Sequence, residues 1–395
     1  MPVVAERDRA ARGGGAVAST ELVLAGAKVV TPQGVLENGW VQVRGTEIAA
    51  VGTGPAPGPA TDLDGRWLVP GFVDVHCHGG GGGSFTSADA EQARTAVATH
   101  RAHGTTTMLA SLVSAPISEL VEQIRALRDL VTAGLLAGVH LEGPFLARSR
   151  CGAHDPDVLR PPETEAVQRL LEAGDGAVRM VTLAPELENS VPAIRQLVAH
   201  GVIAAIGHTD ATLADVAPAL AAGATVATHL FNGMRPLHHR EPGPIGTLLT
   251  DQRVTVELIC DLVHLHPSVV RLAAEHAGPG RTVLVTDAIS ATDAGDGTYR
   301  LGNLPVTVRD GQARLADGSL AGSTLTMDAA FRNLVVSCGV GITDAVAAAS
   351  TTPARLLGLG GVTGSIEPGL AADLVVLDEQ LQVTGVLKDG SWVQR

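Results

Sequence analysis

Short hydrophobic runs alternate with longer stretches rich in alanine and leucine through the centre of the chain. Each run has the length of a buried strand, and each stretch can form a helix. Eight such runs occur within about 220 residues, at 67–78, 105–113, 137–145, 177–186, 201–209, 224–232, 254–264 and 281–288. This number of strand–helix repeats is typical of a (β/α)₈ barrel. A doubly wound sheet fits less well, because the glycine run at 79–83 does not lead directly into a helix.

The two ends of the chain have a different pattern. Valine-rich runs broken by glycine predict short strands at 20–66 and again at 359–395. Because chain ends often lie close together, we expect both segments to form one small β-sandwich. We therefore predict an α/β protein with a TIM-like (β/α)₈ barrel at 67–358 and a disordered tail at 1–19.

Composition narrows the classes of partner. The chain has 395 residues, a net charge of −13 and only 2% aromatic residues, which argues against a nucleic-acid surface. No apolar run is long enough to span a bilayer, and the N-terminal segment lacks the apolar stretch of a signal peptide. The four cysteines form no CxxC pair, which is typical of a reducing compartment. We expect a cytoplasmic protein with no membrane partner.

Polar side chains follow several of the predicted strands. Side chains alternate between faces along a strand, so Asp74, His76 and His78 share one face and Cys77 points the other way, towards the helices. Since the carboxyl ends of barrel strands meet at one rim, we expect the polar side chains at those ends to lie together. The candidates are His76, His78, Glu142, His208, His229 and Asp287.

This set of nitrogen and oxygen donors suits zinc or a similar divalent ion. One histidine at a strand end is more often a hydrogen-bonded core residue, and this is our interpretation of His140. Six donors at strand ends indicate a shared metal centre instead. Lysine occurs only at Lys28 and Lys388, outside the barrel, so Glu142 is the only obvious carboxylate that can bridge two ions.

Several motifs are similar to those of a known family. They are PGFVDVHCHG (70–79), HLEGPF (140–145), GAHDP (152–156), GHTDA (207–211), THLFNGMRPLHHREPG (228–243), DLVHLHP (261–267), VTDA (285–288) and LAGSTLTM (320–327). The chain resembles the amidohydrolase superfamily, and within it the N-acetylglucosamine-6-phosphate deacetylase family. The first motif marks only the superfamily, whereas HLEGPF, THLFNGM, REPG and LAGS are more specific.

The resemblance implies a role for each residue. Glu142, His208 and His229 would hold the principal metal ion. A second ion would be held by His76 and His78 with Glu142 and Asp287, so one or two ions per subunit are expected, with zinc favoured over iron. Asp287 would be the catalytic acid and base. The substrate would be bound by His154, Asn232, Gly233, Arg240 and His264.

The implied reaction is deacetylation of N-acetylglucosamine 6-phosphate to glucosamine 6-phosphate and acetate, in amino-sugar catabolism and cell-wall recycling. A metal-activated water would attack the amide carbonyl. The resemblance also implies a homodimer, in which Arg240 serves its own site or the neighbouring subunit's. One departure from the family pattern is Leu262, where glycine is common.

Four questions stay open. Another amide hydrolase of the superfamily, such as a cyclic amidase or a D-aminoacylase, would share the metal centre without needing Arg240 and His264. A non-catalytic relative would be expected to lose ligands, and this chain keeps all six. The sequence leaves the choice between N-acetylglucosamine and N-acetylgalactosamine phosphates undecided. For the glycine run 79–83, we expect close passage of the backbone over the metals, with simple flexibility as the alternative.

Overall fold

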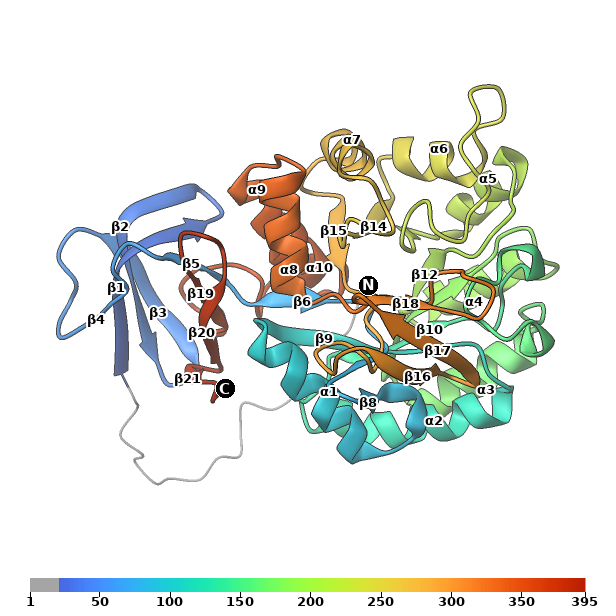
Figure 1. Ribbon diagram of the computed structural model, residues 1–395, viewed down its shortest axis with the longest axis horizontal. Helices are drawn as coiled ribbons and strands as arrows, with labels where there is room; N and C mark the ends of the chain where they lie inside the picture. Colours follow the sequence, from blue (N-terminus) through green and yellow to red (C-terminus); the bar gives the residue numbers. More distant parts are fainter. Residues whose placement is uncertain (1–20, 395) are drawn as a thin grey trace.

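The computed structural model describes residues 21–394, so the tail predicted at 1–19 lies outside the described residues. A barrel surrounded by helices forms the larger part of the molecule, and a separate sheet lies at one end of it (Figure 1).

Eight parallel strands form the barrel in sequence order, which confirms the predicted fold. They are β6 (Phe72–Asp74), β9 (Thr105–Leu112), β10 (Gly138–Glu142), β11 (Val178–Leu183), β12 (Ile203–Ile206), β13 (Val226–Ala227), β14 (Thr255–Ile259) and β15 (Thr282–Val285). The ring closes beyond the last strand, where the Asp287 amide donates to the His76 carbonyl at 2.8 Å and Cys77 bridges Ala288. The side chains that face outwards from the strands are mostly apolar because helices cover the outside of the barrel.

The helices that cover the barrel bury one apolar stripe each. In α2, Leu120, Ile124 and Leu127 are buried at spacings of four and three residues, the periodicity of one helical face. None of the helices within residues 21–394 has the length and apolar character needed to cross a membrane. The helices are α1 (Ala90–Ala102), α2 (Ile117–Thr132), α3 (Thr164–Gly174), α4 (Ser190–Ala199), α5 (Leu213–Ala222), α6 (Gly243–Thr250), α7 (Pro267–Ala277), α8 (Met327–Arg332), α9 (Ile342–Val346) and α10 (Thr352–Leu356).

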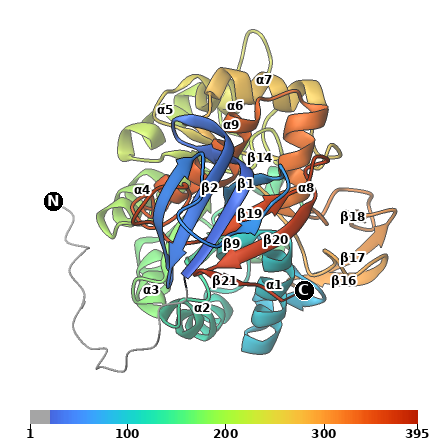
Figure 2. The same cartoon turned by 90° about the vertical axis from the view of Figure 1, so that its left-hand side faces the viewer.

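Both chain ends contribute to one continuous second sheet, so the predicted meeting of the ends is confirmed (Figure 2). Strand β19 pairs antiparallel with β5 on one side and β20 on the other, which inserts the C-terminal segment beside the N-terminal one. The strands are β1 (Glu21–Thr31), β2 (Gly34–Arg44), β3 (Glu47–Thr53), β4 (Thr61–Asp62), β5 (Trp67–Pro70), β19 (Leu374–Leu377), β20 (Val383–Lys388) and β21 (Ser391–Trp392).

The first predicted barrel strand, 67–78, is in fact divided. Residues Trp67–Pro70 belong to the sheet of the chain ends, and the barrel begins at Phe72. Gly71 lies at the division, where an added Cβ would come within 2.2 Å of the Thr106 hydroxyl oxygen. Because the run is apolar on both sides of Gly71, its pattern does not reveal that it serves two sheets.

A small sheet between β15 and α8 was not predicted. It consists of β16 (Gly297–Leu301), β17 (Leu304–Arg309) and β18 (Gln312–Arg314), which form two antiparallel pairs. Its inner side chains, including Val306 and Val308, form a separate small core with Ile289 and Val113 at the carboxyl end of the barrel. The chain therefore adds a cover over the rim that the predicted barrel lacked.

The glycine run forms a hairpin of β7 (Gly79–Gly80) and β8 (Gly83–Ser84) that packs against α1. An added Cβ on Gly83 would lie 2.2 Å from the Gln92 carbonyl oxygen, and one on Gly80 would lie 2.8 Å from His100 Nε2. The close backbone approach is therefore to helix α1, and the expected passage over the metals is wrong.

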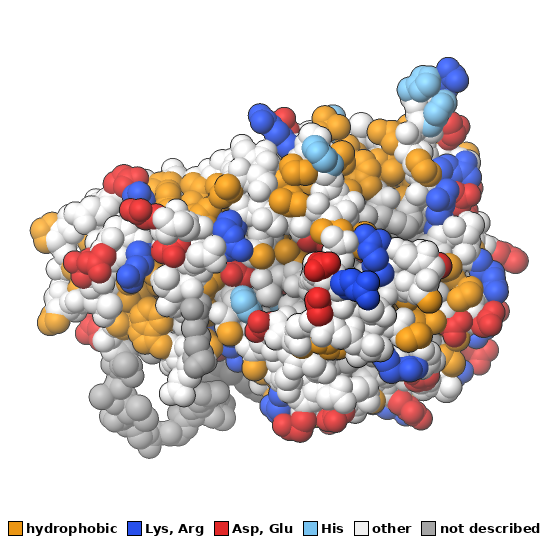
Figure 3. Space-filling model, viewed as in Figure 1, with side chains coloured by type: hydrophobic (Ala, Val, Ile, Leu, Met, Phe, Trp, Pro, Cys, Tyr) orange, Lys and Arg blue, Asp and Glu red, His pale blue; other side chains and the backbone are white. Residues whose placement is uncertain are grey.

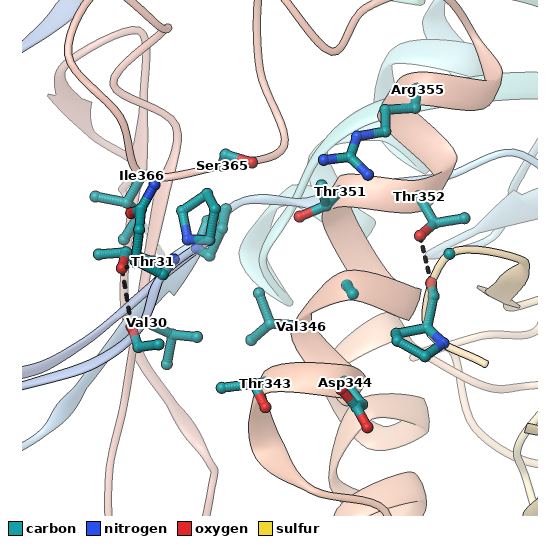
Figure 4. Close-up of a pocket in the computed structure, with 17 residues that line it drawn as sticks. Val30, Thr31, Thr343, Asp344, Val346, Thr351, Thr352, Arg355, Ser365 and Ile366 are labelled. Atoms are coloured by element: carbon teal, nitrogen blue, oxygen red, sulfur yellow. Dashed lines mark hydrogen bonds between the residues drawn. The ribbon is translucent and has the colours of Figure 1, made fainter. Parts of the chain in front are cut away.

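A cavity of about 390 Å³ lies between the barrel and the second sheet, at the amino end of the barrel. Pro70 and Pro279, which precede β6 and β15, form part of its wall, and the turn between β1 and β2 forms the opposite side. Figure 4 shows Arg355 of α10 and Asp344 of α9 on the barrel side of this cavity.

Candidate metal centre and active site

The structure brings the six predicted ligands together at the carboxyl end of the barrel. Five of them line a cavity of about 220 Å³, and His76 lies directly beneath it, fully buried. Each ligand lies at the end of a different strand or just after it, apart from His76 and His78, which both follow β6. The alternation of side chains along that segment explains why these two histidines share the barrel interior.

Glu142, His208 and His229 form the first group of potential ligands. Glu142 Oε1 lies 3.0 Å from His208 Nε2 and 2.9 Å from His229 Nε2. The two Nε2 atoms are 3.1 Å apart, so three donor atoms converge on one point. All three residues are buried, which keeps water from competing for the donors.

His76, His78, Glu142 and Asp287 form the second group. Asp287 Oδ1 lies 3.4 Å from His76 Nε2 and 3.2 Å from His78 Nε2. Glu142 Oε2 lies 3.2 Å from His78 Nε2, while its Oε1 faces the first group. Glu142 thus contacts both groups, as expected for a carboxylate that bridges two ions.

Hydrogen bonds at the other ring nitrogen set the tautomer of three of these histidines. Carbonyl and carboxylate oxygens only accept, so Nδ1 must donate in each case and Nε2 keeps its lone pair. The acceptors are Glu257 Oε2 for His76 (3.2 Å), the Ser111 carbonyl for His78 (3.1 Å) and the Arg150 carbonyl for His208 (2.8 Å). Three lone pairs therefore point at the centre, as a bound metal requires.

The charge balance of the centre also fits a cation. Burial alone lowers the pKa of His76, but the charges of Glu142 and Asp287 outweigh it and raise that pKa well above 6.5. Burial likewise opposes ionisation of Glu142, yet His76 and His154 hold the pKa of this carboxyl well below its usual range. The carboxylates thus stabilise positive charge among the imidazoles, and a divalent ion supplies it without protons.

His154 has the opposite tautomer. The Ser114 amide donates to its Nδ1 at 3.2 Å, so the proton resides on Nε2, which lies 3.3 Å from Glu142 Oε2. Burial lowers the pKa of His154 to about 4, which keeps the ring neutral at pH 7. His154 therefore presents an N–H donor at the cavity, where the other histidines present lone pairs.

Asn232, Gly233 and His264 line the cavity beside the metal centre. Asp261 Oδ2 accepts from His264 Nδ1 at 2.7 Å; burial opposes the charged ring, but this contact raises the pKa of His264 above 6.5. Leu262 adopts a φ of 64°, in the left-handed region that glycine prefers, so the loop keeps a glycine-like backbone despite the leucine.

Arg240 lies apart from the other predicted substrate residues. It is exposed on the loop between β13 and α6, where its Nη1 is 3.0 Å from His239 Nε2, and it does not line the cavity. This loop projects from the molecule in Figure 1, and Figure 3 shows histidine and basic side chains at the end of the projection. Within one chain, the guanidinium is therefore not part of the site.

Cys77 and His140 have the structural roles that the sequence predicted. Cys77 is fully buried, with its sulfur 3.3 Å from His100 Nε2 of α1, on the far side of the strand from the ligands. His140 is hydrogen-bonded at both nitrogens, to the Ser111 and Thr182 hydroxyls at 2.9 Å each. Burial lowers its pKa well below 6.5, so it is a neutral interior residue.

Glu257, a fully buried glutamate in the middle of β14 that contacts His76 and His229, was not predicted from the sequence. No role was predicted for Asp74 either; its carboxylate accepts from the Thr286 hydroxyl at 2.6 Å and connects β6 to the segment that carries Asp287. The available signal was the same for both: a charged residue inside an otherwise apolar strand.

Comparison with known proteins agrees with this geometry. A family model described as the amidohydrolase family matches residues 67–393. The chain belongs to this family.

Several proteins similar to this chain are named as deacetylases of N-acetylated amino-sugar phosphates. An N-acetylgalactosamine-6-phosphate deacetylase from Escherichia coli O157:H7 is 37% identical, over 94% of this chain and 98% of its own length. An N-acetylglucosamine-6-phosphate deacetylase from Homo sapiens is 39% identical, over 84% of each chain. The structure is also similar to that of N-acetyl-D-glucosamine-6-phosphate deacetylase from Mycobacterium smegmatis, a mutant of which was solved with N-acetyl-D-glucosamine-6-phosphate; the TM-score is 0.93 at 47% identity, covering 95% of this chain and all of that one.

Proposed function

We propose that this protein hydrolyses the amide of N-acetylglucosamine 6-phosphate to acetate and glucosamine 6-phosphate, using one or two divalent ions, with zinc favoured. The observation that carries the proposal is one cavity that joins a carboxylate–histidine centre to a second cluster of donors at Asn232, Gly233 and His264. The deacetylases to which the chain is similar support the choice of substrate. Such a role belongs to amino-sugar catabolism and cell-wall recycling in the cytoplasm.

The side chains account for the proton transfers that amide hydrolysis needs. A bound divalent ion lowers the pKa of a water molecule from 15.7 to about 7 and polarises the amide carbonyl. His76 and His78 overcome the effect of burial and hold the pKa of the Asp287 carboxyl below its usual range, so this carboxylate is ionised and can accept a proton from the attacking water. It then returns the proton to the amide nitrogen as the C–N bond breaks, so glucosamine leaves as a neutral amine.

Other residues of the cavity hold the substrate. The Nε2–H of neutral His154 can donate to the acetyl oxygen or to a sugar hydroxyl. His264, whose positive form Asp261 favours, suits the phosphate, together with the Asn232 side chain and the Gly233 N–H. The exposed position of Arg240 favours a homodimer in which this arginine reaches the partner's phosphate subsite.

The decisive experiment measures acetate release from N-acetylglucosamine 6-phosphate by protein of known zinc content. We expect kcat/KM at least about a hundredfold higher than for unphosphorylated N-acetylglucosamine, because a buried phosphate subsite loses its partner in the latter. N-acetylgalactosamine 6-phosphate, assayed in parallel, determines the preference between the two sugars. Equal rates with and without phosphate would favour the cyclic amidase or aminoacylase alternative, and absence of turnover would favour a non-catalytic relative.

A mixing experiment tests the assignment of Arg240. If Arg240 acts across a dimer, mixing Arg240→Ala with Asp287→Asn should restore activity, because each mixed dimer then contains one complete site. If Arg240 acts within its own chain, every site in the mixture carries a defect and activity stays low.

A further inference from the structure

Glu257 is a charged residue in the interior of the barrel, one layer below the metal centre. It lies in the middle of β14, and its side chain is completely buried. An ionised carboxylate in such a place is costly unless hydrogen bonds or a cation compensate it. Its contacts therefore indicate why a glutamate occupies this position.

One oxygen of Glu257 connects the two groups of potential ligands. Oε2 accepts from His76 Nδ1 at 3.2 Å and from the backbone amide of His229 at 3.1 Å. The first contact holds the proton of His76 on Nδ1, so that Nε2 is free to bind a metal. The second contact fixes the chain at the end of β13, where the His229 side chain begins.

The other oxygen, Oε1, is buried and has no hydrogen-bond partner within residues 21–394. Hydrogen bonds thus offset the cost of burial for only one of the two carboxylate oxygens, Oε2. The remaining negative charge is best balanced by positive charge at His76, which is the imidazole that lies closest to this carboxylate. A divalent ion on His76 Nε2 supplies that charge through the ring.

We propose that Glu257 is a positioning residue that keeps His76 in its metal-binding tautomer and thereby determines the affinity of the ion bound at His76 and His78. The inference rests on the proposed metal centre, but not on the identity of the substrate. Glu257 does not line the cavity, so its effect on catalysis passes through the residues it bonds, the ring of His76 and the backbone of His229.

Two substitutions separate the hydrogen bond from the charge. Glu257→Gln keeps an oxygen that can accept from His76 Nδ1 and removes the negative charge, whereas Glu257→Leu removes both. Metal-free protein is titrated with zinc against a chromophoric chelator, and the relevant ion is the one whose binding is weakened in His76→Asn. We expect about a 10- to 100-fold loss of affinity for this ion in Glu257→Leu and a smaller loss in Glu257→Gln.

A matched control is Thr182→Val, which removes a buried hydroxyl that bonds His140 and Thr228 in the same barrel interior but touches no ligand. It should leave zinc affinity within about twofold of the wild type. Thermal unfolding of each variant checks that the barrel is intact. Unchanged zinc affinity in folded Glu257→Leu would overturn the proposal.

Combining the substitutions distinguishes positioning from a general structural role. If Glu257 acts through His76, adding Glu257→Leu to His76→Asn should lower zinc affinity by no more than about twofold further. An equal loss in both backgrounds would mean that Glu257 only supports the barrel, which contradicts the inference. These readouts need no substrate, so failure to release acetate would refute the proposed function and leave this result standing.

Discussion

The two ends of the barrel carry cavities of very different character. At the amino end, the cavity between the barrel and the second sheet has a volume of about 390 Å³, and the cavity over the metal centre has only about 220 Å³. The larger one is lined by prolines, threonines and the opposite charges of Arg355 and Asp344. The smaller one is lined by seven histidine, glutamate and aspartate side chains, of which Asp287 is one.

The active end of the barrel is therefore identified by the clustering of titratable side chains and not by the volume of the cavity. Among the described residues, two of the three groups of potential metal ligands meet at the carboxyl rim of the barrel, the third (Asp74, Cys77 and His100) lies beneath helix α1, and none lines the larger cavity. Parallel strands direct successive side chains to one rim, whereas nothing in the fold focuses side chains at the junction with the second sheet.

The largest effect should come from Asp287→Asn at the small cavity. Removing the proton acceptor should lower kcat by about 10²- to 10⁴-fold, with little change in thermal unfolding. Steady-state acetate release by protein of equal zinc content measures the effect. Asp293→Asn, on the exposed loop that follows β15, is the matched control and should keep normal turnover.

Glu142→Gln should lower the zinc affinity of both groups of ligands in the small cavity at once. Because Glu142 contacts each group, we expect zinc affinity to fall more than about a hundredfold, beyond the usual cost of losing an outer hydrogen bond to a ligand. Chelator competition measures the loss. If only one of two bound ions were weakened, Glu142 would not be a bridging ligand.

A pH profile should reveal the contribution of His264. Asp261 raises the pKa of His264, so the ring is protonated below that pKa and loses its charge as pH rises through it. Since the substrate phosphate is already a dianion above about pH 7, KM should rise by about tenfold as pH increases from neutrality through the raised pKa of His264. His264→Gln should give a KM that is high and flat over this range, with kcat little changed.

The same ion pair should affect stability. A folded pKa above 6.5 means that the pair of His264 and Asp261 stabilises the fold fully below that value and loses this contribution as pH rises through the folded pKa. Urea unfolding at several pH values should therefore show a stability difference between wild type and His264→Gln that shrinks as the solution becomes alkaline.

The smallest effect is expected at the large cavity. Arg355→Leu removes its positive charge and should leave kcat/KM within about twofold, as is usual for a surface substitution distant from the chemistry. Kinetics with N-acetylglucosamine 6-phosphate provide the measurement. A loss of kcat/KM of tenfold or more would contradict the assignment of activity to the carboxyl end alone and would give the amino end of the barrel a functional role.

The regular parts of this molecule were predictable because parallel strands leave a strong pattern. The eight apolar runs locate every barrel strand, and the polar residues that follow them locate His76, Glu142, His208 and Asp287 at one rim. The division at Gly71 was not predictable, since both halves of that run are apolar and buried.

The pattern of apolar and polar positions also did not predict which side chains contact each other within the barrel interior. Glu257 sits inside an apolar strand, and only the packed structure shows that it faces His76 across the barrel. The glycine run 79–83 was predicted to pass over the metals, because such a run indicates a close backbone approach but does not indicate which element is approached. The position of Arg240 in relation to a partner's site depends on a second copy of the chain.

The order of strands in the second sheet has a consequence for biosynthesis. Strand β19 lies between β5 and β20, so one edge of β5 has no partner until the ribosome has made β19 at Leu374–Leu377. The barrel segments emerge earlier and can collapse while that apolar edge is still open, which exposes the nascent chain to edge-to-edge aggregation. Removal of the segment that contains β19 and β20 would therefore leave a folded barrel joined to an incomplete, aggregation-prone sheet.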